Sequence, residues 1–167
     1  MSVDVKTLEN LLNEGKLVEL GGLLREGIRD RNVINFLNRK YEDFKKIAEK
    51  FTELPPDERL KMAFILAAKT TIIEDMRTTQ IRKILSMSNM IYRKIRRRKG
   101  EISADISKMR YILAYTASRH KGKKDPITPI LEVSDKILPK LDSSNYEEFH
   151  EFLQAIVAYH KFLGGRD

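Results

Sequence analysis

Hydrophobic residues recur along almost the whole chain at a spacing close to 3.6 residues, the period of an α-helix, and seldom alternate as they do in strands. The clearest stripe lies between residues 30 and 52. Its apolar members are Ile34, Leu37, Tyr41, Phe44, Ala48 and Phe51. Glycines and the Pro55-Pro56 pair divide the periodic stretches, because both residue types interrupt helices. The pattern predicts an all-α protein, a single helical bundle of about six or seven helices.

Polar residues mark where several of these helices begin and end. Thr78 or Thr79 is expected to cap a helix that continues to about Arg97. The last helix is expected to start at the capping-box spacing of residues 144–147 and to end at Gly164-Gly165.

The length of 167 residues fits one domain with a proper hydrophobic core. We predict that residues 1–53 form an N-terminal helical extension packed on the bundle. Residues 54–167 would form the basic bundle itself, giving one domain overall.

Composition excludes several classes of protein. The chain has no cysteine, so disulfides, thiol nucleophiles and cysteine-bound metals are absent. Its longest uninterrupted apolar run, Met62 to Ala68, is far shorter than a membrane span, and its N-terminus lacks the features of a secretory signal. We therefore expect a cytoplasmic protein without a membrane partner.

Charge is strongly segregated along the chain. Between Met76 and Lys124 there are 15 Lys and Arg residues against two acids, a net charge of +13, whereas the remainder carries −5. A folded surface of this kind repels itself unless a polyanion neutralises it, and phosphate is the usual one. The segregation favours nucleic-acid binding.

Two dense clusters lie within this basic third, from Arg93 to Lys99 and from Arg119 to Lys124. Helix dipoles explain two or three cations at a helix end, but not six. We expect the two helix ends to converge on one face that binds RNA phosphates. The candidate RNA-binding residues are Arg77, Arg82, Lys83, Arg93, Arg96, Arg97, Arg98, Lys99, Arg119, His120, Lys121, Lys123 and Lys124.

Other residues of this region have structural interpretations as well. Arg93 and Arg110 could instead lie inside as partners of Glu74 or Asp75. Three tyrosines, at positions 92, 111 and 115, do not interleave with the charges. We expect them in the core with their hydroxyls at its rim, which disfavours stacking of single-stranded bases as the binding mode.

The sequence offers little support for catalysis. His150 and His160 are ten residues apart, too far along a helix to share a metal, and His160 falls on an apolar stripe that predicts a core position. His120 could act as a general base in RNA cleavage, but no acid stands at a spacing that would orient it. We therefore predict a protein that is not an enzyme and has no metal, cofactor or small-molecule substrate.

Three segments together resemble the small, non-catalytic helical subunit of the type III-A CRISPR effector, the Csm complex. They run from Thr78 to Lys83, from Leu113 to Arg119 and from Glu151 to Gly165. The last is the most specific, because Ala-Tyr-His-Lys-Phe shortly before paired glycines is an unusual ending. The resemblance covers roughly residues 55–165.

The resemblance implies a subunit present in several copies along a ribonucleoprotein filament, in contact with guide RNA and the guide–target duplex. Its partners would be guide RNA, target RNA, other Csm subunits and further copies of itself. Residues that match are Arg82, Arg119, Tyr159, His160 and Lys161, although burial could equally explain Tyr159 and His160. The arginine run at 96–98 is assigned to RNA on charge alone.

Three alternatives stay open at this point. The chain could be a helical DNA-binding module, a subunit whose basic face meets an acidic protein, or a ribonuclease that uses His120.

Overall fold

The computed structural model describes residues 3–98, 100–118 and 126–167, and the regular structure in these ranges is helical. The predicted all-α fold is confirmed, and the described residues form eight α-helices, close to the expected six or seven. The helices are α1 (Val5–Asn13), α2 (Leu17–Glu26), α3 (Arg31–Ile47), α4 (Pro56–Ala68), α5 (Thr78–Arg96), α6 (Ser103–Ser118), α7 (Thr128–Ile137) and α8 (Tyr146–Phe162). Short turns extend three of them: a 3₁₀ turn at Ala48–Glu53, a π-helical turn at Lys69–Ile73 and a 3₁₀ turn at Leu138–Lys140.

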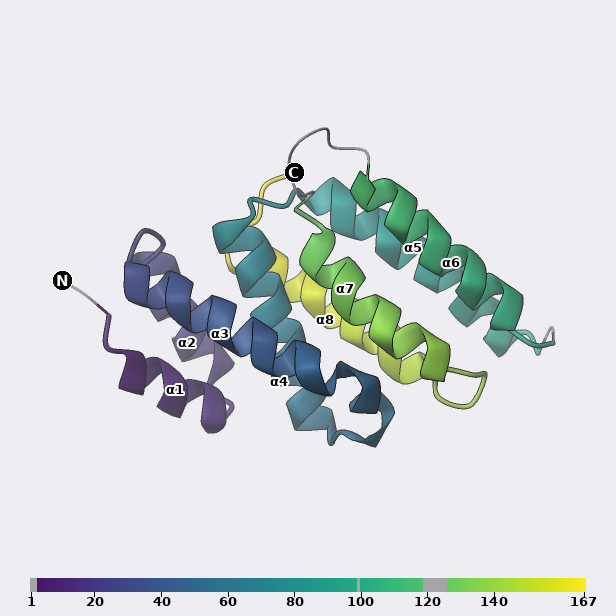
Figure 1. The fold of residues 1–167 in the computed structure, drawn as a ribbon, viewed down its shortest axis with the longest axis horizontal. Helices are drawn as coiled ribbons and strands as arrows, with labels where there is room; N and C mark the ends of the chain where they lie inside the picture. The colour runs from purple at the N-terminus through teal and green to yellow at the C-terminus, as the bar shows by residue number, and fades with distance from the viewer. Residues whose placement is uncertain (1–2, 99, 119–125) are drawn as a thin grey trace.

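Helix α8 forms the centre of the molecule, with its main contacts to α4 and α5 (Figure 1). Helix α4 supplies the seven-residue apolar run Met62–Ala68, all of which is buried. A helix that is hydrophobic around its whole circumference belongs inside a protein. The run that is too short for a membrane therefore forms the middle of the core.

Helices α1, α2 and α3 cover one side of α4, and the α5–α6 pair lies at the opposite edge of the molecule (Figure 1). The predicted stripe of α3 is buried except at Ile34, which is half-exposed, while Val33 and Phe36 join the core. The division of the chain at residue 53 stays a prediction.

Two buried histidines join α8 to α5. His160 Nε2 lies 3.0 Å from Thr78 Oγ1, and His160 Nδ1 lies 2.8 Å from Thr71 Oγ1. Because the Thr78 hydroxyl donates to the Arg166 carbonyl, it accepts from His160 Nε2–H, which places a proton on Nε2. The expected core position of His160 is confirmed, since its side chain is fully buried.

The second buried histidine, His150, lies ten residues before His160 on α8. His150 Nδ1 lies 2.8 Å from Ser88 Oγ, and the Tyr146 hydroxyl donates to the same oxygen at 2.9 Å. All three side chains are buried. A polar cluster thus closes each end of the α5–α8 contact.

The paired glycines after α8 have two different roles. Gly164 adopts a φ of +91°, the left-handed conformation that ends a helix. Gly165 packs directly on the imidazole: an added Cβ would lie 2.2 Å from His160 Nε2. The unusual ending of the third sequence segment is therefore explained by packing.

Both predicted helix starts need correction. Thr78 is the first residue of α5, but its hydroxyl is buried against His160 and Arg166, so it does not cap the helix. Instead the Gln80 side chain accepts from the backbone N–H of Arg77 at 3.0 Å. Helix α8 starts at Tyr146 rather than within a capping box, because the Asn145 side chain accepts from the backbone N–H of Asp142.

We predict that Gly165→Ala destabilises the fold by about 1–3 kcal/mol, because the new methyl group would displace a fully buried ring. Urea unfolding followed by circular dichroism measures the change. Gly22→Ala is the matched control: Gly22 is exposed within α2 with no atom near its Cβ position, so alanine should raise stability by about 0.5–1 kcal/mol. Equal stability of Gly165→Ala and the unchanged protein would contradict the packing role of Gly165.

We also predict that stability falls as the pH drops below about 6.5, the ordinary pKa of histidine. Burial lowers the pKa of His160, helped by the charge of Lys161, and burial also lowers the pKa of His150. The unfolded chain therefore takes up protons near pH 6.5 while the folded chain does not, so the free energy of unfolding rises with pH through this window and is retained above it. Unfolding at pH 5.5 to 7.5 should show a shallower dependence for His160→Asn; an unchanged slope would exclude His160 as a cause.

Candidate nucleic-acid interface

Helix α5 has one buried face and one cationic face. Ile81, Ile84, Ser88 and Ile91 point into the core. Seven basic side chains of α5 and of its two ends are exposed, and we call them the α5 cationic face. They are Arg77, Arg82, Lys83, Arg93, Arg96, Arg97 and Arg98. With a rise of 1.5 Å per residue, the face extends over about 30 Å.

Few charges of the α5 cationic face are compensated within the described part of the chain. Several basic side chains elsewhere form ion pairs: Lys40–Glu9, Lys45–Glu132, Lys69–Glu74, Lys94–Asp105, Lys161–Asp167 and Arg166–Asp75. No member of the cationic face forms such a pair with a described acid, although the charge of Arg82 adds to that of Lys161 in lowering the pKa of Asp167. The fold therefore holds seven like charges on one surface with little compensation from described acids.

An aromatic residue orders one arginine of this face. The Arg96 guanidinium lies over the ring of Tyr92, 5.9 Å from its centroid. That ring stacks on His150 at 4.7 Å, and its hydroxyl donates to Glu147 at 3.2 Å. Tyr92 thus occupies the expected rim of the core and connects the cationic face to the buried histidine cluster.

Helices α5 and α6 are antiparallel, since Lys94 near the end of α5 pairs with Asp105 near the start of α6 at 2.9 Å (Figure 1). Ser118, the last residue of α6, therefore lies at the end of the pair where α5 begins, far from Arg96. The expected convergence of the two cationic clusters stays a prediction, because the second cluster lies outside the described residues. The candidates Lys99, Arg119, His120, Lys121, Lys123 and Lys124 lie outside the described residues.

The alternative partners considered for two arginines are also wrong. Arg110 pairs with Asp135 of α7, with Nε 2.7 Å from Oδ1, and this hydrogen bond raises the pKa of its guanidinium. Glu74 and Asp75 pair with Lys69 and Arg166 instead. Arg93 is exposed, so it belongs to the α5 cationic face.

Sequence analysis missed an exposed aromatic surface on α6. Tyr111 and Tyr115 were expected in the core, but 63% and 67% of their surfaces are exposed. The sequence indicated this exposure, because neither tyrosine falls on the buried stripe formed by Ile106, Met109 and Leu113. Helical spacing put them one turn apart on the outer side of α6.

The third sequence segment has a structural explanation. Tyr159 packs edge-on against Phe64, with ring centroids 5.1 Å apart. His160 is buried, and Lys161 pairs with Asp167 at 2.6 Å. These three residues hold the end of α8 in place.

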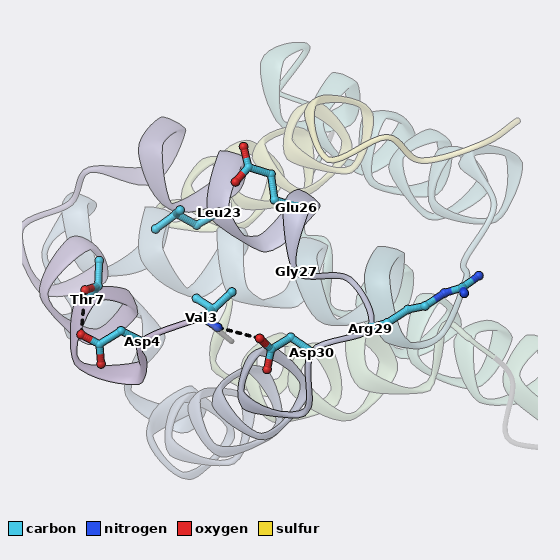
Figure 2. Close-up of a pocket in the computed structure, with 8 residues that line it drawn as sticks. All are labelled: Val3, Asp4, Thr7, Leu23, Glu26, Gly27, Arg29 and Asp30. Atoms are coloured by element: carbon cyan, nitrogen blue, oxygen red, sulfur yellow. Dashed lines mark hydrogen bonds between the residues drawn. The ribbon is translucent and has the colours of Figure 1, made fainter. Parts of the chain in front are cut away.

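A cleft of about 540 Å³ lies at the N-terminal side of the molecule, between the first helices (Figure 2). Two of its carboxylates serve as helix caps: Asp4 accepts from Lys6 N–H, and Asp30 accepts from Asn32 N–H at 2.8 Å. Asp30 also accepts from Val3 N–H at 2.6 Å. The bond from Val3 lowers the pKa of Asp30. Figure 2 shows Arg29 pointing away from Asp4, so the polar groups do not converge as an active site would require.

Across residues 3–98, 100–118 and 126–167, no three histidine or acidic side chains gather closely enough to hold a metal ion. No helix in these ranges is both long and apolar enough to span a bilayer.

Comparisons with known proteins connect this geometry to a family. The family described as Csm2 Type III-A matches residues 38–166, so the match starts within α3, earlier than the resemblance we drew from sequence. A curated protein of Streptococcus thermophilus, described as "CRISPR system Cms protein Csm2", is 38% identical over 93 residues, which cover 54% of this chain and 74% of the relative. The chain therefore belongs to the Csm2 family, the small subunit of the type III-A CRISPR Csm effector complex.

Proposed function

We propose that this subunit binds the sugar–phosphate backbone of guide RNA and of the guide–target duplex through the α5 cationic face. The observation that carries the proposal is the display of seven exposed, internally unpaired cations along one helix. Arginine and lysine attract phosphates without reading bases, so binding would be electrostatic and insensitive to sequence. The deep, narrow major groove of A-form RNA, which hides base edges, favours this mode.

The role we propose is positional rather than catalytic. Both described histidines are buried in structural clusters and hydrogen-bonded to hydroxyls, so neither can reach a substrate. The seven residues of the α5 cationic face can instead hold RNA at a defined position for other subunits of the Csm complex. The basic candidates at 99, 119–121, 123 and 124 would add cations to this binding, with further copies of this chain sharing one duplex.

A helical DNA-binding module is the main competing function. A recognition helix needs polar side chains that read base edges, and the outer side of α5 offers mainly arginine and lysine, with Asn89 half-exposed. Comparison of RNA with DNA in the experiment below separates the two functions.

We predict that changing Arg93, Arg96 and Arg97 together to alanine weakens RNA binding and flattens the plot of log affinity against log salt by about 2 to 3 units. Each lost phosphate contact releases about one counterion fewer. Alanine favours the helix, so the fold should be kept. Fluorescence polarisation with a labelled RNA duplex, the matching single strand and a DNA duplex at several salt concentrations measures the effect.

The matched control removes Arg25, Arg29 and Arg31, which are exposed. They belong to the end of α2, the start of α3 and the turn between them, and these helices lie on the other side of the molecule from α5 (Figure 1). This control lowers the net charge by the same amount, so it should leave the slope nearly unchanged if the α5 cationic face is the binding surface. Equal slopes for the two variants would reject that surface, and a strong preference for a particular DNA duplex would favour the DNA-binding alternative.

We also predict that labelled RNA stays intact during long incubation of the purified subunit with Mg²⁺. The chemistry of cleavage needs a positioned general base, and the described histidines are not available. Gel electrophoresis of the RNA is the measurement, with His120→Ala as control. Cleavage that disappears in His120→Ala would establish the ribonuclease alternative.

A further inference from the structure

The α5–α6 pair carries an apolar groove that the proposed RNA contacts do not use. Its floor and walls are formed by Met87, Met90 and Ile91 of α5 with Met109 and Ile112 of α6. Three of the six methionines of the chain thus meet at one place. The groove has a volume of about 220 Å³ and opens to solvent between the two helices.

Exposed side chains continue the groove outward. Met90 is 71% exposed, and Tyr111 and Tyr115 of α6 are exposed almost as much. An apolar surface of this kind is costly to leave in water and indicates an interaction site. Tyrosine, methionine and arginine are also the residues in which protein interfaces are enriched.

The charge around the groove defines its complement. Lys108 lines it, and Arg93 and Arg97 lie one and two turns along α5 on the side of Met90. The acid that lines it, Asp105, is already neutralised by Lys94 at 2.9 Å. The rim is therefore positive around an apolar centre.

We propose that this groove binds an amphipathic helix of a neighbouring protein subunit of the Csm complex, with an apolar stripe flanked by carboxylates. An antiparallel pair of helices with a methionine-lined furrow accepts the i, i+3, i+4, i+7 side chains of such a helix, and methionine adapts to their shapes. A carboxylate on its flank would pair with Lys108, whereas Arg93 and Arg97 attract the acidic helix from the rim and remain part of the α5 cationic face. The membership of the chain in a multi-subunit complex supplies the partner class, whereas the RNA-binding proposal is not needed.

The observations favour a protein over RNA at this site. Five of the seven lining residues are apolar, and a phosphate backbone gains nothing from an apolar furrow. Unpaired bases could stack on Tyr111 and Tyr115 beside the cations. That arrangement would use the tyrosines and leave the methionine-lined furrow between the helices empty.

The test uses a charge-neutral double variant, Met90→Gln with Tyr115→Gln, so that electrostatic binding of RNA is not altered directly. Both positions are exposed, so the fold should be kept, and circular dichroism verifies it. The control is Val18→Gln with Ile28→Gln, two exposed apolar residues at the other side of the molecule. Biolayer interferometry measures binding of each variant to a Csm complex assembled from the remaining subunits and guide RNA.

We expect the Met90/Tyr115 variant to bind that complex at least about tenfold more weakly, as for loss of an interface hot spot, and the control to bind unchanged. The affinity of the isolated variant for an RNA duplex should stay within about twofold. A photo-cross-linking residue at position 90 of the assembled complex should then label a helical segment rich in acidic residues on another subunit.

Three results would overturn the inference. The Met90/Tyr115 variant could bind the complex as well as the control does. The cross-link could form with RNA while RNA affinity falls, which would assign the tyrosines to base stacking. A cross-link between two copies of this chain would assign the groove to self-association. None of these outcomes depends on the salt slope, so failure here and failure of the RNA-binding proposal are distinguishable.

Discussion

The antiparallel contact between α5 and α8 is the constraint on which the rest of the structure depends. His150 meets Ser88 and His160 meets Thr78, so two positions ten residues apart on α8 match two positions ten residues apart on α5. The spacings agree because both helices rise 1.5 Å per residue. Each buried hydrogen bond contributes only about 1 kcal/mol, but a slip of one turn would leave all four polar groups unpaired inside the core. The two clusters therefore fix the register as well as the packing.

That register determines what α5 presents to its surroundings. With the isoleucine stripe held against α8, the arginines must point outward, where none of them forms an ion pair with a described acid. Repulsion among seven like charges opposes folding, and burial of the inner face of α5 and its hydrogen bonds offset that cost. Acidic residues are plentiful elsewhere in the chain, yet they pair with cations of their own regions, such as Lys45 with Glu132. Charge segregation in the sequence thus becomes a separate cationic surface in the fold.

The α5–α6 pair can then serve two kinds of partner at once. Its arginine-rich outer side suits a polyanion, and the methionine-lined furrow beside it suits an apolar helix. Under the two proposals, adjacent surfaces on one rigid helical pair would couple the position of bound RNA to that of a neighbouring subunit. In the N-terminal helices, by contrast, carboxylates cap helices and form surface ion pairs.

The sequence by itself determined the helical class, the buried run in α4, the core position of His160 and the cationic character of α5, because helical period and charge are local properties of the chain. The sequence did not determine which helices and which side chains lie next to one another. The antiparallel course of α6 along α5 was not evident from the sequence, and Thr78 turned out to be a buried partner of His160 rather than a cap. The exposure of Tyr111 and Tyr115 depends on which side of α6 faces its neighbours. Only tertiary structure decides such pairings, because they join residues distant in sequence.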